Sequence, residues 1–119
     1  MPGDYERMFL RALAWTLAFE IPVVVGFLKF GPWKVDLSWC RALAAGAVPT
    51  MLTLPYLWFL GPWLMPDRSV LMVVGELSVV AVEAVLLGLL APLSWKRALA
   101  LSFAANLVSF LSGKLLPLL

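Results

Sequence analysis

Three glutamates stand inside apolar stretches of the chain, and they are the residues whose type and position best suit chemistry. They are Glu20, Glu76 and Glu83. On insertion scales a charged residue at the centre of a membrane helix costs about 2.5–3.5 kcal/mol, and such residues mark ion pathways and proton relays. Because a carboxyl group there binds a proton or a cation, we expect these glutamates to handle a proton, a cation or a cation-coupled solute.

Hydroxyl and amide side chains recur at helical spacing in two further apolar stretches. The two sets are Gly46, Thr50 and Thr53, and then Ser102, Asn106 and Ser109. Each set falls on one face of a helix, and small or polar faces of membrane helices turn inward, toward one another. We therefore expect one interior binding site, made of Glu20, Glu76, Glu83, Asn106, Thr50, Thr53 and Ser109.

Prolines lie close to these polar residues. Pro22 follows Glu20 by two residues, and Pro49 and Pro55 flank Thr50 and Thr53. A proline within a helix removes one backbone hydrogen bond and kinks the helix, which frees the carbonyl group four residues earlier. Kinks at Pro22, Pro49 and Pro55 would place free carbonyl oxygens near the site, where they suit a hard cation. The alternative is that these prolines only bend the helices for packing.

The elements that must position these residues are membrane-spanning helices. The 119 residues are 63% hydrophobic and 13% charged, whereas soluble domains are about half apolar and a quarter charged. A span needs roughly 20 apolar residues, and four stretches qualify, at about 12–30, 41–60, 70–90 and 98–116. We expect a single transmembrane domain over residues 1–119, with an uncleaved first span.

A repeated string indicates an internal duplication. The sequence LSWCRALA at 37–44 returns as LSWKRALA at 93–100, an offset of 56 residues. The same offset pairs Glu20 with Glu76, Thr50 with Asn106 and Thr53 with Ser109. The prediction is an all-α membrane protein, a four-transmembrane-helix bundle built from two tandem helical hairpins, repeat 1 at about 12–60 and repeat 2 at about 68–116. Because each repeat has an even number of spans, the pseudo-twofold axis should lie along the membrane normal.

Several kinds of chemistry are excluded or disfavoured. The chain has no histidine and one cysteine, Cys40, which removes His-based catalysis, an intrachain disulfide and Cys/His metal sites. We expect no catalytic residue, no cofactor and no nucleic-acid partner, since a net charge of +2 is ordinary for a membrane protein. A metal site, if present, would use Glu20, Glu76 and Glu83.

Three functions stay open, and the first is preferred. It is a small transporter or channel-like protein with a central carboxylate site. The second is a non-catalytic membrane subunit whose polar helix faces bind partner helices, and the third is an intramembrane enzyme with a metal bound by oxygen ligands. The expected partners are the lipid bilayer, a small cation or solute, and a second copy or another membrane protein.

Two resemblances bear on these functions. The segment FEIPVVVGFLKFG (19–31) resembles the first helix of the small multidrug resistance transporters. That resemblance implies an essential carboxylate at Glu20 and an antiparallel dimer. The chain departs from that family at Glu76 and Glu83 in the third span. The segments FEIP, TMLTLPYLW, GELSVVAVEAV and ANLVSFLSG resemble uncharacterised small bacterial inner-membrane proteins, which implies that location and no particular activity.

The basic residues predict no orientation. One side of the predicted membrane carries Arg7, Arg11, Arg68 and Lys114, and the other carries Lys29, Lys34, Arg41, Lys96 and Arg97. Four residues against five give the positive-inside rule almost no bias.

Overall fold

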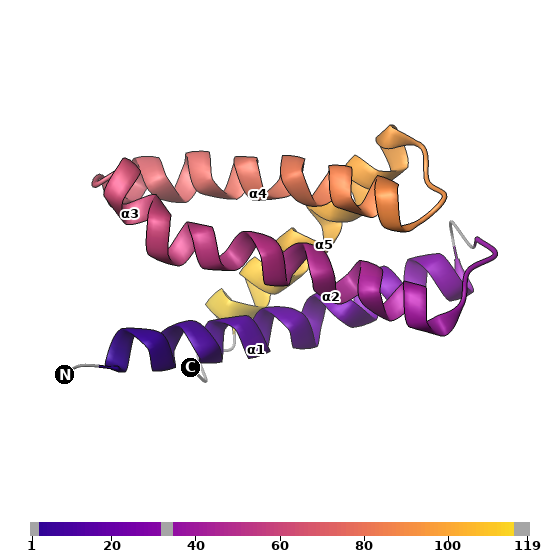
Figure 1. Cartoon of the computed structure of the whole chain (residues 1–119), viewed down its shortest axis with the longest axis horizontal. Helices are drawn as coiled ribbons and strands as arrows, with labels where there is room; N and C mark the ends of the chain where they lie inside the picture. Colours follow the sequence, from indigo (N-terminus) through magenta and orange to yellow (C-terminus); the bar gives the residue numbers. More distant parts are fainter. Residues whose placement is uncertain (1–2, 32–34, 116–119) are drawn as a thin grey trace.

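The computed structural model describes residues 3–31 and 35–115, and over these residues the chain is helical with no strand (Figure 1). The elements in chain order are α1 (Asp4–Val25), η1 (Gly26–Phe30), α2 (Trp39–Pro55), η2 (Tyr56–Leu60), α3 (Gly61–Leu64), α4 (Arg68–Leu90) and α5 (Trp95–Leu115). The elements η1 and η2 are π-helical turns that continue α1 and α2.

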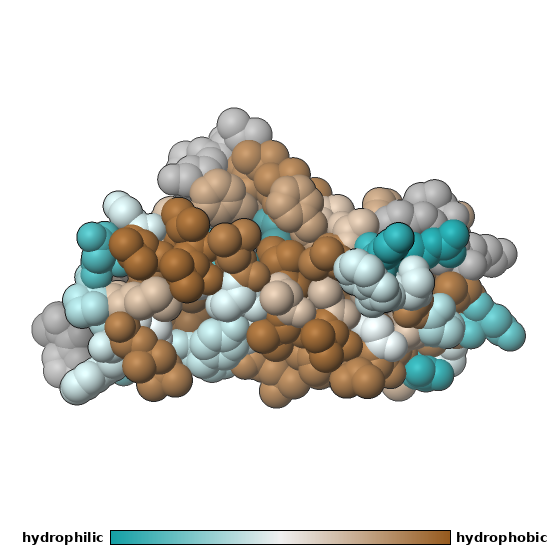
Figure 2. Space-filling view, turned by 90° about the horizontal axis from the view of Figure 1, so that it is seen from above, coloured by the Kyte–Doolittle hydropathy of each residue, from teal (hydrophilic) through white to brown (hydrophobic). Residues whose placement is uncertain are grey.

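Three of the continuous helices are long and apolar enough to cross a membrane: Asp4–Phe30, Trp39–Leu64 and Arg68–Leu90. Their outer surfaces carry large apolar side chains, among them Trp63, Val85 and Leu89. Figure 2 shows apolar residues over most of the middle of one face, whereas the most hydrophilic residues gather toward the two ends. This distribution suits a bilayer. The stretch predicted as the fourth span lies in α5, apart from Leu116, which is outside the described residues, and α5 is not among these three helices.

Helices α1, α2 and α4 run back and forth along the long axis of the molecule, whereas α5 crosses behind them at an oblique angle (Figure 1). Helix α1 packs against α2 and α5, and α4 packs against the same two helices. Thus α1 and α4 lie diagonally opposite each other, with α2 and α5 between them. A polar side chain on α1 or α4 therefore has neighbours on both α2 and α5.

The repeated string forms two helix starts. The Ser38 hydroxyl accepts a hydrogen bond from the backbone N–H of Arg41 at 3.2 Å, and the Ser94 hydroxyl accepts one from Arg97 at 3.3 Å. A serine at this position satisfies a backbone donor that has no partner within the helix. The tryptophan after each serine is exposed, as befits a side chain at the membrane interface.

The three prolines lie within continuous helices and differ in environment. Pro22 is exposed on α1, whereas Pro49 is buried and Pro55 is half-buried at the end of α2. The carbonyl freed by Pro22 belongs to Ala18, which is also exposed. Pro22 thus faces away from the buried Glu20, two residues earlier. The wide turn η2 follows Pro55 directly, and η1 begins four residues after Pro22.

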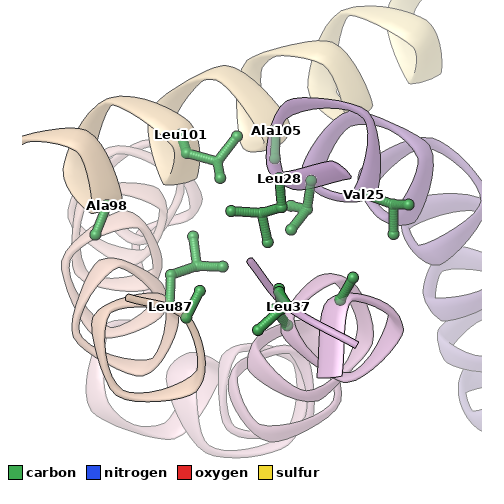
Figure 3. Packing of buried hydrophobic residues seen from close by; sticks show 11 residues of the cluster. Val25, Leu28, Leu37, Leu87, Ala98, Leu101 and Ala105 are labelled. Atoms are coloured by element: carbon green, nitrogen blue, oxygen red, sulfur yellow. The ribbon is translucent and has the colours of Figure 1, made fainter. Parts of the chain in front are cut away.

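A cluster of buried apolar side chains fills the half of the molecule that holds the α1–α2 and α4–α5 connections. We call this set the apolar cluster; it comprises Val24, Val25, Leu28, Leu37, Ala42, Ala45, Leu87, Ala91, Ala98, Leu101 and Ala105. Figure 3 shows Leu28, Leu87 and Leu101 pointing toward one another from α4, α5 and the end of the first helix. The alanines of α2 let this helix approach α1 closely, and those of α5 let it approach α4 closely.

We predict that Gly46→Ala destabilises the protein. A Cβ atom at Gly46 would lie 3.0 Å from the Ile21 Cα atom, so α1 and α2 would have to separate. Overpacking of this kind lowers the free energy of unfolding by about 1–3 kcal/mol, which unfolding in mixed detergent micelles measures. The matched control is Gly88→Ala, where the new Cβ meets only the Ala98 Cβ at 4.0 Å. That variant should keep or raise stability, by up to about 1 kcal/mol, and equal losses in both variants would contradict the packing argument.

Candidate functional site

Two of the three glutamates are buried at the centre of the molecule. Glu20 on α1 and Glu83 on α4 are each 3% exposed, while Glu76, also on α4, is half-buried. Glu83 shares one face of α4 with Gly75, Val79 and Leu87, a spacing of four residues that turns all of these positions inward.

Glu20 accepts hydrogen bonds from the two helices that flank α1. The Thr50 hydroxyl on α2 donates to Glu20 Oε1 at 2.7 Å, and the Ser109 hydroxyl on α5 donates to Oε2 at 3.0 Å. Both carboxylate oxygens therefore have a donor, which offsets much of the cost of burying this group.

Glu83 is held by the same two helices. The Thr53 hydroxyl on α2 donates to Glu83 Oε2 at 2.8 Å, and the Asn106 amide on α5 donates to Oε1 at 2.7 Å. The Thr50 hydroxyl also lies 3.5 Å from Glu83 Oε2. Thr50 thus stands between the two carboxyl groups and links them into one network.

A second layer of hydrogen bonds orients these donors. Thr53 Oγ1 lies 2.9 Å from the Pro49 carbonyl, Ser109 Oγ lies 3.1 Å from the Asn106 carbonyl, and Asn106 Nδ2 donates to the Ser102 carbonyl at 2.8 Å. The Trp15 indole donates to Ser112, which in turn donates to the Ser109 carbonyl. Within the described residues every buried side-chain nitrogen or oxygen has a partner.

A cavity of about 350 Å³ lies beside Glu20 and Glu83, which we call the carboxyl pair. Its wall is formed by residues of α1, α2, η2, α4 and α5. The carboxyl-bearing residues Glu20, Glu76 and Glu83 all line it, together with Thr50, Asn106 and Ser109. Its remaining wall is mostly apolar or aromatic: Ala12, Thr16, Leu54, Leu57, Trp58, Val79, Phe110 and Gly113. Trp58 is held in place by its neighbours, since its ring packs on Tyr5 and Phe9 and its carbonyl accepts a hydrogen bond from the Tyr5 hydroxyl.

No lysine or arginine lines this cavity in the part of the chain that the structure describes. Lys29 donates to the Leu37 carbonyl and Arg41 to the Leu90 carbonyl, both near the connections between helices. The donors around the two carboxyl groups are hydroxyls and one amide, all uncharged. Among the described residues, nothing but a bound proton or cation could balance a negative charge at this site.

The three glutamates named as the ligands of a metal, if one is present, do not form one cluster in the described part of the chain. Among residues 3–31 and 35–115, no three acidic, cysteine or histidine side chains come close enough to hold a metal ion. Glu76 lines the cavity with Glu20 and Glu83 but takes no part in the hydrogen-bond network that joins those two residues.

The other predicted site residues lie around Glu20 and Glu83. Thr50, Thr53, Asn106 and Ser109 all bond to Glu20 or Glu83. The sequence reasoning missed Thr16 and Trp15. Thr16 precedes Glu20 by four residues, so helical spacing alone places both on one face. Trp15 has no comparable signal, because its contact is with Ser112 at the far end of the chain.

We predict that Thr50→Val destabilises the protein more than Thr50→Ser. Valine keeps the shape of threonine but removes the donor to Glu20, and an unsatisfied buried group costs about 1–3 kcal/mol. Serine keeps the hydroxyl and loses only a methyl group, worth about 1 kcal/mol. Unfolding in detergent micelles compares the two variants, and equal stability would mean that the Thr50 hydrogen bond does not hold the carboxyl groups.

Comparison of the chain with protein-family models, with curated protein sequences and with solved structures found no significant match. The arrangement of the site is therefore the basis for assigning a function.

Proposed function

We propose that this protein is a small membrane transporter or channel-like protein that moves protons through a central pair of carboxyl groups, Glu20 and Glu83. One observation carries the proposal: two buried carboxyl groups share Thr50 and line a cavity that has no basic side chain in its described wall. In a bilayer such a pair is costly unless its charge is neutralised. An ion that binds and leaves would do so.

The hydrogen bonds favour a proton over a metal cation. Each hydroxyl has one hydrogen to donate, yet Thr53 faces both the Pro49 carbonyl and Glu83, and Ser109 faces both the Asn106 carbonyl and Glu20. When such a hydroxyl turns to its carbonyl, a proton on the carboxyl group completes the other contact. Rotation of two hydroxyls thus lets Glu20 and Glu83 gain or lose a proton while the heavy atoms stay in place.

A metal cation would need the same oxygens for coordination. Hard cations in proteins bind oxygen ligands at about 2.0–2.6 Å. Glu20 and Glu83 already accept hydrogen bonds at all four carboxylate oxygens, so a metal ion would have to share these oxygens with the hydrogen-bond donors. A proton needs only the rotation of a hydroxyl group.

We further propose that all four long helices, α5 included, cross the bilayer as two duplicated hairpins, with Glu83 as the counterpart of Glu20. The offset of 56 residues relates Thr50 to Asn106 and Thr53 to Ser109. Exchanging these partners turns the Glu20 bonds to Thr50 and Ser109 into the Glu83 bonds to Asn106 and Thr53, which are the bonds observed. This correspondence supports a pseudo-twofold axis between the two carboxyl groups.

The pairing of Glu20 with Glu83 requires the two hairpins to differ in length. Glu83 follows Glu20 by 63 residues, seven more than the helices α2 and α5 are apart. In the first hairpin the α1–α2 link includes η1 and residues 31–38, whereas only residues 91–94 join α4 to α5. Seven residues are about two helical turns, so Glu83 lies on the same face of α4 as Glu76, the residue that the offset of 56 pairs with Glu20.

The alternative function as an assembly subunit has less support. Its premise is that polar helix faces seek partner helices, but Thr50, Thr53, Asn106 and Ser109 bond to glutamates of the same chain.

Proton flux into proteoliposomes tests the proposal. The liposomes enclose a pH-sensitive dye, and valinomycin lets potassium flow outward down its gradient, which makes the lumen negative. Under these conditions the parent protein should acidify the lumen. Glu20→Gln and Glu83→Gln should each reduce that flux to the level of empty liposomes, because an amide cannot take up and release the proton. Replacing sodium by choline in the buffer should leave the flux unchanged.

The matched control is Glu6→Gln, since Glu6 is an exposed carboxylate in the first turn of α1. This variant should transport like the parent. Undiminished flux in either Glu20→Gln or Glu83→Gln, with the protein folded and inserted, would rule the carboxyl pair out as the proton site.

A further inference from the structure

Among the described residues, the cavity beside the carboxyl pair extends toward one half of the molecule. On α1 its walls are Ala12 and Thr16, which precede Glu20, and on α4 it includes Glu76, which precedes Glu83. On the antiparallel helix α5 the wall continues through Phe110 and Gly113, which follow Ser109. All of these positions lie toward the end at which α1 begins and α5 ends (Figure 1).

The other half is closed by the apolar cluster. Leu28 and Leu101 are fully buried and Leu87 is 2% exposed, and their side chains meet across the interior (Figure 3). Close-packed apolar side chains leave no room for water, and an ion crossing them would lose its hydration. The carboxyl pair is thus accessible from one side and sealed from the other.

Glu76 occupies a distinct place on the open side. It precedes Glu83 by seven residues, which is two helical turns or about 10 Å along α4. It is half-buried, and within the described residues it has no hydrogen bond like those that hold Glu20 and Glu83. Apart from the pair, it is the charged residue of the described cavity wall.

A lone carboxylate in an apolar-walled cleft attracts cations, because low-dielectric walls focus its field. The cavity wall also includes apolar and aromatic side chains, Leu57 and Trp58 among them, which add no opposing charge. The only charged groups that face Glu76 from the described cavity wall are therefore Glu20 and Glu83. From α2 and α5 it faces hydroxyl, amide and apolar groups.

We propose that Glu76 is the entrance residue of a one-sided path, drawing cations, protons included, into the cavity that leads to Glu20 and Glu83, and that the apolar cluster is the closed barrier beyond them. This inference rests on the proposed function for its purpose. Its geometry, however, is testable without transport.

Thiol accessibility tests the one-sided path. In a Cys40→Ala background, which removes the native exposed cysteine, single cysteines replace Ala12 or Thr16 on the open side and Leu28 or Leu101 in the apolar cluster. A water-soluble trimethylammonium methanethiosulfonate should modify the first two at least roughly tenfold faster than the last two, since only the first two border the cavity. Similar rates on both sides would overturn the path.

Charge selectivity tests the role of Glu76. For Thr16→Cys, the trimethylammonium reagent should react faster than its sulfonate counterpart by more than their ratio on a free thiol. Adding Glu76→Gln should lower this ratio of reaction rates severalfold. Adding Glu6→Gln, which removes a carboxylate outside the cavity, should leave the ratio unchanged. An unchanged ratio in Glu76→Gln would overturn the entrance role.

The two proposals fail separately. Loss of the selectivity effect while Glu20→Gln and Glu83→Gln still abolish proton flux would remove only the entrance residue. The expected selectivity together with undiminished flux in those variants would leave Glu76 as a cation-attracting residue and remove the proton site.

Discussion

The requirement that a carboxyl group inside apolar surroundings keep its hydrogen bonds governs this structure. Glu20 and Glu83 have these hydrogen bonds because α2 and α5 each supply one donor to Glu20 and one donor to Glu83. Those four contacts constrain the rotation and the height of every long helix. A shift of α5 by one residue would rotate Asn106 and Ser109 by about 100° and leave both carboxyl groups short of a donor.

Close packing elsewhere serves the same requirement. Gly46 lets α2 pack closely against Ile21, one residue from Glu20. The alanines of the apolar cluster let α2 and α5 pack closely against the neighbouring helices α1 and α4. The two serine caps set where α2 and α5 begin, and therefore the height at which their hydroxyl and amide groups stand. The repeated string is thus remote from the carboxyl groups and still determines which residues can reach them.

Much of the site was predictable from spacing, because period alone places Thr50 with Thr53 and Asn106 with Ser109 on inward faces. The partner of Glu20 was not. Equal offsets favoured Glu76, whereas the Thr50 hydroxyl links Glu20 to Glu83. Under the proposed duplication, the longer first connection, with its π-helical turn, accounts for this difference of seven residues. Connection lengths and wide turns leave little trace in a hydrophobic pattern. The exposed position of Pro22, by contrast, follows from spacing, since a proline two residues from a carboxyl group lies more than half a turn away around the helix.

The absence of a basic side chain from the described cavity wall has an electrical consequence. Under the proposed function, no fixed positive charge in the described wall would compensate when the pair loses a proton, so each change of occupancy would alter the net charge within the bilayer. An elementary charge that crosses the whole membrane is worth about 2.3 kcal/mol per 100 mV, and a site reached through a cavity experiences part of that drop. Occupancy of the pair by the proposed proton would therefore depend on membrane voltage as well as on concentration.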